Sequence, residues 1–219
     1  MKLIKPSYEI LNENDLFRAT KEIELAARTC YKSEDKIGDG TDLTLVKMLM
    51  ERGHDAMLEF GPSISVKFIC DRGVSHELVR HRLCSFAQES TRYCNYSKDK
   101  FDNQITFIIP SWINAGTMPK VIKVPSNDPI QIWLRSINRA EIDYNKLISL
   151  GWKPQQARSV LPNSLKTEIV IKANLREWRH IFFQRVSPKA HPQMRELIIP
   201  LLQHFQKFSP VLFDDIKAE

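Results

Sequence analysis

The sequence predicts an α+β fold: a single domain over residues 1–219 in which a central sheet is backed by helices. Segments that alternate apolar and polar residues predict strands, and segments with an apolar stripe and recognisable caps predict helices. The two kinds follow one another without a regular βαβ rhythm. With 219 residues, of which 42% are hydrophobic and 26% charged, the chain is long enough to bury one core.

Two helices are predicted at the start of the chain. Asn14-Asp15 can cap a helix that runs to about Tyr31, and Thr41 begins a second helix after a polar loop. Gly53 ends the second helix, because glycine readily adopts the positive φ that follows a helix C-terminus. The expected apolar stripes are Leu16, Ala19, Ile23, Ala26 and Ala27 in the first helix, and Leu43, Val46, Leu49 and Met50 in the second.

Three strands are predicted from residue 63 onward. Residues 63–70 and 165–173 alternate apolar and polar side chains, as half-buried strands do, and 104–109 is rich in residues that favour strands. Residues 74–83 predict a short helix. Residues 111–127 have no period and contain glycine and proline, which predicts a long loop or lid.

Four helices are predicted in the second half of the chain. Asp128-Pro129 supplies an N-cap and a first-turn proline, and Asn174 supplies another N-cap. Pro200 is expected to kink the last helix. The predicted ranges are 129–150, 154–162, 174–185 and 192 onward.

Composition favours a cytoplasmic protein. No apolar run approaches the roughly 18 residues of a membrane span, and residues 1–12 lack the basic start and apolar run of a signal peptide. The cysteines contain no Cys-x-x-Cys pair, which argues against a zinc site or a disulfide framework and favours free, mostly buried thiols. They are Cys30, Cys70, Cys84 and Cys94.

The net charge of +6 is concentrated in residues 72–92 and 176–195, where apolar residues interrupt the basic ones. This pattern favours a pocket for a small phosphorylated ligand, with no membrane and no nucleic acid as partner. A basic nucleic-acid-binding protein is the alternative. It would bind long polynucleotides with a strong dependence on salt and carry no chromophore.

Three common site motifs are excluded. His76 and His81 are five residues apart, whereas the HExxH zinc motif places its histidines four apart, so no metal site is expected. No glycine-rich dinucleotide turn or P-loop is present among only seven glycines. Any phosphate must then be bound by side chains and helix N-termini.

The most informative stretch, from Arg80 to Tyr93, holds three arginines beside hydroxyl side chains. Arginines this close repel one another, so they need an anion nearby. Arg80-His81-Arg82, followed after seven residues by Ser90, resembles the signature of flavin-dependent thymidylate synthases. Blocks that also resemble this family lie at 54–59, 157–162 and 174–195.

The resemblance implies an enzyme that methylates dUMP to dTMP, with FAD as cofactor, NADPH as reductant and methylenetetrahydrofolate as carbon donor. Such enzymes are homotetramers whose active sites lie at subunit interfaces. Hydride would pass from reduced flavin to the uracil ring, which Arg185 would polarise. No cysteine nucleophile is required, and Cys84 has no base beside it in the sequence. The loop over 111–127 could cover the folate side.

The resemblance also implies two sets of site residues. Those expected to bind FAD are Glu59, Arg80, His81, Arg82, Gln88, Asn174, Arg176 and His180. Those expected to bind dUMP are Glu77, Arg80, Gln88, Ser90, Arg92, Arg158 and Arg185, with Ser90 and Arg92 donated by a neighbouring subunit. Arg185 is the residue implied to be catalytic, and no metal is implied.

Four positions depart from the usual family pattern. Ala56 stands where members often have Ser or Thr, so one hydrogen bond to FAD is expected to be absent. Glu77 stands where some members have Gln, Gln88 where Glu is common, and His180 where some have Asn. None of these changes removes an arginine. A family member that binds nucleotide but has lost catalysis is a further alternative.

Overall fold

The computed structural model describes residues 1–98, 101–119, 121–123 and 125–218. Helices and strands are mixed along the chain, which confirms the predicted α+β class. The chain divides into two compact units. Unit 1 comprises Met1–Ser7, Ile69–Leu78 and Ala87–Ile169, and unit 2 comprises Tyr8–Phe68, Val79–Phe86 and Val170–Glu219. The expectation of a single domain over residues 1–219 stays a prediction.

Two sheets hold the strands. β1 (Lys2–Ile4) pairs in parallel with β5 (Thr106–Ile108) inside unit 1, with Leu3 opposite Phe107. A four-stranded sheet has the order β2-β3-β6-β4. Its strands are β2 (Ser7–Ile10), β3 (Ile64–Asp71), β6 (Lys166–Ala173) and β4 (Ser85–Gln88), each of which begins in one unit and ends in the other.

The three predicted strands are confirmed as β3, β5 and β6. Strands β1, β2 and β4 were missed, because segments of three or four residues carry too little periodicity to be recognised.

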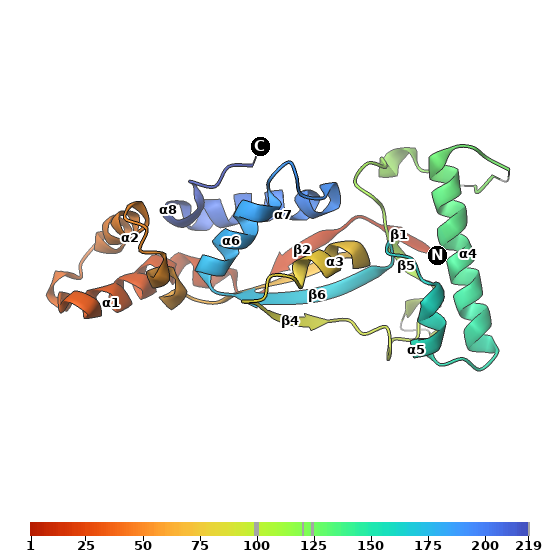
Figure 1. Cartoon of the computed structure of the whole chain (residues 1–219), viewed down its shortest axis with the longest axis horizontal. Coiled ribbons are helices and arrows are strands. Elements are labelled where there is room, and N and C mark those ends of the chain that lie inside the picture. The colour runs from red at the N-terminus through yellow and green to blue at the C-terminus, as the bar shows by residue number, and fades with distance from the viewer. Residues whose placement is uncertain (99–100, 120, 124, 219) are drawn as a thin grey trace. The chain divides into compact units, whose positions relative to one another are not determined.

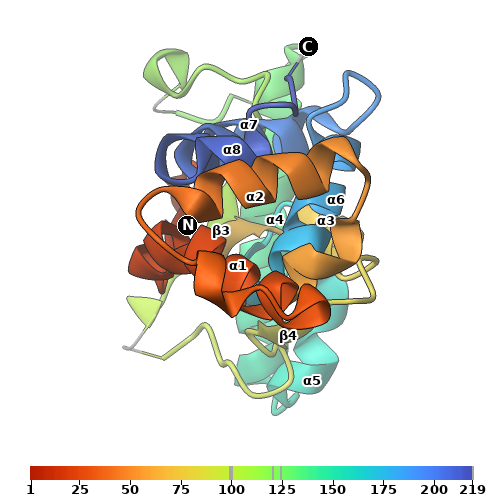
Figure 2. The same ribbon diagram turned by 90° about the vertical axis from the view of Figure 1, so that its left-hand side faces the viewer.

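Unit 2 is mostly helical. Its helices are α1 (Ala19–Tyr31), α2 (Thr41–Glu51), α6 (Leu175–Arg185), α7 (Pro192–Phe208) and α8 (Pro210–Phe213), with the 3-10 helices η1 (Glu13–Arg18), η2 (Glu34–Lys36) and η3 (Asp55–Phe60). Figure 1 shows α6 beside α7, and Figure 2 shows α1 beside α2. The expected kink at Pro200, inside α7, stays a prediction.

Both early helices differ in detail from their predictions. The first begins as the 3-10 helix η1 and becomes α-helical only at Ala19, because Arg18 has φ −100° and ψ 0°. In the second, the hydroxyl of Thr20 donates to the Asp42 carboxylate at 2.6 Å and holds that acid inside. The stripe is therefore rotated: Leu43, predicted to be buried, is 52% exposed.

Unit 1 holds α3 (Arg72–Leu78), α4 (Pro129–Ser149), α5 (Pro154–Ala157) and the 3-10 helices η5 (Ala115–Thr117) and η6 (Arg158–Val160). The helix predicted over 74–83 is displaced. The Asp71 carboxylate accepts from the backbone N–H of Val74 at 2.7 Å, so α3 begins directly after β3. Residues 79–84 then form turns, including one closed by Cys84 N–H donating to the His81 carbonyl at 3.2 Å.

The caps predicted at Asp128 and Gly53 are confirmed, whereas the cap predicted at Asn14-Asp15 is wrong, because both residues lie inside η1 and Arg18 precedes α1. Asp128 accepts from the N–H of Ile130 at 3.1 Å, and Gly53 has φ +70°. The loop over 111–127 is irregular apart from η5 in its described part; Lys120 and Val124 lie outside the described residues. All four cysteines are free, but only Cys70 is fully buried. Within the described ranges, no helix has the length and apolarity needed to cross a membrane.

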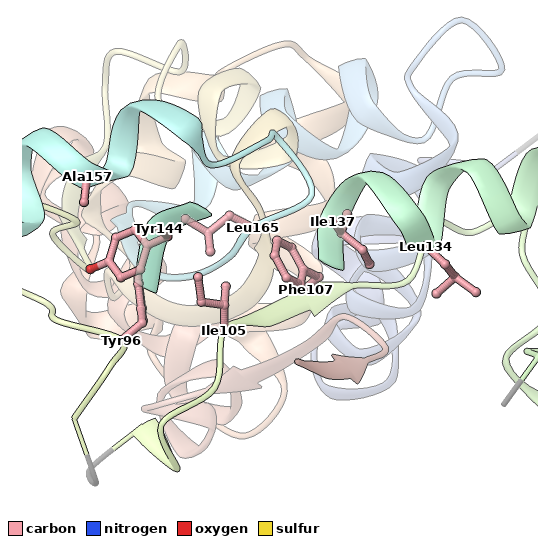
Figure 3. Close-up of a cluster of buried hydrophobic side chains, with 8 residues drawn as sticks. All are labelled: Tyr96, Ile105, Phe107, Leu134, Ile137, Tyr144, Ala157 and Leu165. Atoms are coloured by element: carbon pink, nitrogen blue, oxygen red, sulfur yellow. The ribbon is translucent and has the colours of Figure 1, made fainter. Parts of the chain in front are cut away.

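Each unit has its own core. In unit 2 the indole of Trp178 packs against Phe182 and Phe205 and donates to the Ile64 carbonyl at 3.0 Å. In unit 1 the side chains of α4 meet those around β5 (Figure 3). That cluster contains Tyr96, Ile105, Phe107, Leu134, Ile137, Tyr144, Ala157 and Leu165.

Candidate functional site

Unit 2 holds all but one of the residues predicted to bind FAD, and α6 presents two of them on one face. Asn174 caps α6 by accepting from the N–H of Glu177 at 2.9 Å. Arg176 and His180 follow four residues apart, so their side chains lie on the same side of the helix, and both are exposed. Only Gln88 of that predicted set lies in unit 1.

Glu59, at the end of η3, pairs with Arg176. The Nη1 of Arg176 donates to Oε1 of Glu59 at 2.6 Å, and the two side chains are 51% and 46% exposed. An ion pair this open to water adds little stability, about 0–1 kcal/mol. Two predicted site residues that are 117 positions apart thus meet at the surface, where a ligand can reach both.

His81 lies inside unit 2 and holds Arg185, the predicted catalytic residue. The Nε of Arg185 donates to Nε2 of His81 at 3.0 Å. His81 is only 5% exposed, whereas Arg185, on the last turn of α6, is half-buried. The histidine predicted to contact the cofactor is therefore also a hydrogen-bond acceptor for the arginine predicted to contact the uracil.

His81 is neutral at physiological pH. Its pKa is lowered from 6.5 to about 4, first by burial and then by the charges of Arg185 and His180. On its other side, Nδ1 lies 3.8 Å from Oε1 of Glu177, an acid that is itself 5% exposed. Burial raises the pKa of Glu177, and His180 opposes that shift.

These side chains form a cluster with metal-ligand chemistry. The ligand atoms of His81, Glu177 and His180 lie within 4.8 Å of one another. Arg185, however, uses Nε2 of His81 as its acceptor, and its fixed positive charge opposes a divalent cation at the same place. The arrangement suits the orientation of an arginine better than the ligation of a metal.

Cys84 is not a nucleophile in this environment. Its Sγ lies 4.0 Å from Oε1 of Glu177, and its pKa is raised to about 12, first by burial and then by that carboxylate. The thiol therefore keeps its proton at neutral pH, and the thiolate required for attack is not formed.

Arg80 and Arg82 flank His81 in the turns after α3, and both are exposed. Because His81 points inward between them, the motif separates into one interior acceptor and two surface cations. The surface cations present fixed positive charge and planar donor groups to any anion that approaches this part of unit 2.

Unit 1 contains a second basic site, a pocket of about 350 Å³. Its polar walls include Arg72, His76, Thr91, Arg158 and Ser159, and no carboxylate is among its lining residues. Arg158, predicted to bind the dUMP phosphate, donates from Nη1 to Thr91 Oγ1 at 2.9 Å. Sequence patterns pointed to His76 only through the excluded zinc motif and did not single out Arg72; the spacing of four residues between them on one helix was the available signal.

The other residues predicted to bind dUMP in unit 1 are Glu77, Gln88, Ser90 and Arg92. Gln88, half-buried, donates to the Oγ atoms of Ser75 at 2.9 Å and Thr167 at 3.2 Å. Ser90 Oγ accepts from the N–H of Arg92 at 3.3 Å, and the exposed Arg92 guanidinium lies 5.5 Å from the Tyr93 ring centroid. Glu77 is half-buried on α3.

A partly buried ion-pair network holds the segment that carries these residues. Lys166 pairs with Glu89 at 3.0 Å and with Glu168 at 2.7 Å, and Tyr96 donates to Glu89 at 3.2 Å. The backbone N–H of Glu89 also donates to the Glu168 carbonyl at 2.8 Å. Gln88 and Ser90 flank Glu89 and are thereby fixed against β6.

The sequence matches a known protein family. Residues 14–211 match the Thy1 family model, described as thymidylate synthase complementing protein. The flavin-dependent thymidylate synthase of Corynebacterium aurimucosum is 32% identical over 200 residues, which cover 88% of this chain and 78% of that protein. The one from Geobacter sulfurreducens is 28% identical over 200 residues, covering 88% and 80%.

A solved structure shares the fold. It is the crystal structure of a UMP/dUMP methylase, PolB from Streptomyces cacaoi, bound with 5-Br dUMP. It matches with a TM-score of 0.70 at 22% identity and covers 98% of this chain and 96% of that one. With the family model matching nearly the whole sequence, the chain belongs to the Thy1 family, as its resemblance to the flavin-dependent thymidylate synthases predicted.

Proposed function

We propose that this protein methylates dUMP to dTMP, taking the carbon from methylenetetrahydrofolate and using FAD with NADPH as reductant. The observation that carries the proposal is the hydrogen bond from Arg185 to His81. It joins the histidine of the Arg80-His81-Arg82 motif to the arginine expected at the uracil edge, in a chain of this family. Family membership implies a flavin cofactor, and the specific substrates are our inference.

The donor set of unit 2 fits FAD. Exposed arginines at positions 80, 82 and 176 suit the two negative charges of a pyrophosphate, because charge-assisted bonds are roughly twice as strong as neutral ones. Glu59 is an acceptor and suits a hydroxyl of the cofactor. The Asn174 side-chain oxygen accepts the helix-cap hydrogen bond, so its side chain can serve the cofactor only as a donor, through the amide N–H groups.

Binding of dUMP is assigned to the basic pocket of unit 1 together with Glu77, Gln88, Ser90 and Arg92, and to Arg80 and Arg185 of unit 2. The pocket has two arginines and no carboxylate among its lining residues, which suits a phosphate dianion. We further infer a homotetramer with active sites at subunit interfaces, in which a neighbouring subunit donates Ser90 and Arg92.

Arg185 is the proposed catalytic residue. Its Nε–H donates to the neutral ring of His81, which orients the guanidinium that we assign to a uracil edge. There they would stabilise negative charge that develops on the pyrimidine. When bound, the reduced flavin supplies the hydride. No thiolate takes part, because burial and Glu177 keep the Cys84 thiol protonated.

The first test is a visible absorption spectrum of the purified protein after incubation with FAD and desalting, repeated anaerobically with NADPH. We expect a retained flavin band that bleaches, followed by dTMP formation from dUMP and methylenetetrahydrofolate. UMP is the comparison substrate, because it differs only in the 2′-hydroxyl. A colourless protein that binds long polynucleotides in a salt-dependent way would favour the nucleic-acid alternative instead. A flavoprotein that binds dUMP without turnover would indicate lost catalysis.

A further inference from the structure

We propose that Glu177 is a positioning residue: it sets the tautomer of His81 and, through that ring, the aim of the Arg185 guanidinium. The consequence for catalysis rests on the function proposed for Arg185. The geometry of Glu177, His81 and Arg185 does not depend on that function, because all three lie in unit 2 and their contacts involve no ligand.

Glu177 and Arg185 are on the same helix but too far apart to touch. They are eight positions apart, which is about 12 Å along the axis of an α-helix. His81, from the turns after α3, bridges that gap with one ring nitrogen toward each. Its Nδ1 lies 3.8 Å from the Glu177 carboxylate, and its Nε2 accepts from Arg185 at 3.0 Å.

Both neighbours select the same form of the imidazole. The Nε–H of Arg185 needs a lone pair on Nε2, which places the single ring proton of neutral His81 on Nδ1. A carboxylate beside Nδ1 stabilises a proton there. The opposite tautomer would turn an N–H of His81 against the Nε–H of Arg185 and break the hydrogen bond between them.

Burial makes this selection effective. His81 and Glu177 are each 5% exposed, so water screens their interaction weakly. The titratable groups that face them are few: Arg185 and His180 on α6, and the Cys84 thiol 4.0 Å from Glu177. His180 stacks edge-on to His81, with 6.0 Å between ring centroids.

A purely structural role for Glu177 is the competing interpretation. Glu177 is the third residue after the N-cap Asn174, the position at which a capping-box glutamate reaches back to the cap. Here its backbone N–H donates the cap hydrogen bond to Asn174 Oδ1, while its carboxylate faces His81 and Cys84. The side chain is directed at the ring that holds Arg185.

The decisive measurement is the tautomer of His81 in the FAD-loaded protein, read from the side-chain ¹⁵N spectrum of histidine-labelled samples. His81→Gln identifies its signals among those of the six histidines. We expect wild-type His81 to carry its proton on Nδ1. A wild-type ring with the proton on Nε2 would overturn the proposal without any variant, and this readout is independent of whether dUMP is the substrate.

Two substitutions test the role of the carboxylate. Glu177→Gln removes the negative charge beside Nδ1, so a share of the Nε2–H tautomer should appear and kcat should fall. Glu177→Leu removes both the charge and the polar group: a larger share of the Nε2–H tautomer should appear, and kcat with dUMP should fall about 10- to 100-fold, as expected for a misplaced reacting group. The KM for NADPH should not change.

Glu24→Gln is the matched control. Glu24 is a buried glutamate of the same unit, and it accepts from Arg28 at 2.9 Å and from Thr41 at 3.1 Å. Its substitution should lower stability while leaving the His81 tautomer and kcat unchanged. If Glu177→Leu does not fold, the wild-type and Glu177→Gln spectra still decide. Equal loss of kcat in Glu24→Gln and Glu177→Leu, or an unchanged tautomer in Glu177→Leu, would reduce Glu177 to a structural residue.

Discussion

The two basic sites differ in how their cations are balanced. In unit 2, Arg185 is held by a neutral histidine, and Arg176 is paired with Glu59. In the pocket of unit 1, Arg158 and Arg72 donate to the hydroxyls of Thr91 and Thr167 and have no carboxylate among the lining residues. In unit 2 the partners of these two arginines are side chains of the protein itself. In the unit 1 pocket no carboxylate is among the described residues that line the wall, so a bound anion would balance the arginines.

This difference predicts different kinetic effects for substitutions at the two basic sites. A preorganised donor is most valuable to a transition state, because no reorganisation is needed when charge develops. A pocket of uncompensated cations instead gains mainly from the binding of an anion, in the ground state as well as in the transition state. Substitutions of Arg185 in unit 2 should therefore act on kcat, and those of the arginines in the unit 1 pocket on the KM for dUMP.

Replacing Arg185 with Ala should have the largest effect. Loss of one preorganised donor at a developing charge costs roughly 10²- to 10³-fold in kcat. Arg185→Lys should restore little of it, because an ammonium group lacks the planar fork that can donate to His81 and to a uracil edge together. The measurement is steady-state dTMP formation alongside dUMP binding. Unimpaired turnover in Arg185→Ala with dUMP still bound would assign catalysis elsewhere.

Acid should weaken unit 2 through His81. Its pKa is about 4 in the fold and 6.5 in the unfolded chain, so between these values the unfolded state binds more protons. Stability should therefore fall as the pH is lowered from 6.5 to 4, by at most about 3 kcal/mol, and be unaffected by this group above pH 6.5. Denaturant unfolding across this range measures it.

The matched variant for this test is His81→Gln, which offers Arg185 an acceptor that does not titrate. Its stability should depend less steeply on pH than that of the wild type over the same window. Glu177 acts in the opposite sense, because its raised pKa makes the folded state the better proton binder. Only the difference in pH dependence of stability between wild type and His81→Gln isolates the contribution of the histidine. Identical pH dependence in the two proteins would contradict the lowered pKa of His81.

In the unit 1 pocket, Arg158→Ala should raise the KM for dUMP by about 10- to 100-fold, since hydrogen bonds to charged groups contribute about 1.5–3 kcal/mol. Flavin retention should be unchanged. The control is Arg139→Ala on α4, which removes a surface arginine that pairs with Asp143 at 2.8 Å. A fall in kcat with an unchanged KM would erase the distinction between the two basic sites.

Local sequence patterns predicted the helices and strands that carry these sites. They did not predict which residues from distant segments contact one another. Asn174 and Asp128 were recognised because a cap depends on only a few neighbouring residues. The exposed position of Leu43 was missed because it depends on Thr20, a residue of another helix. The same limit applies to the candidate site: Arg185 and His81 are 104 residues apart, so the arginine's partner could not be read from either segment.

Glu59→Gln should have the smallest effect on stability. It also tests whether the exposed pair of Glu59 and Arg176 binds the cofactor. Its pair with Arg176 is about half exposed, so its loss should change the free energy of unfolding by less than about 1 kcal/mol. If Glu59 and Arg176 bind the cofactor, the same substitution should clearly lower the retention of FAD on desalting, although the free energy of unfolding changes little. Asp143→Asn, which removes the exposed partner of Arg139 in unit 1, controls for charge alone. Unchanged FAD retention with reduced stability would make the pair a structural contact and remove Glu59 from the proposed cofactor site.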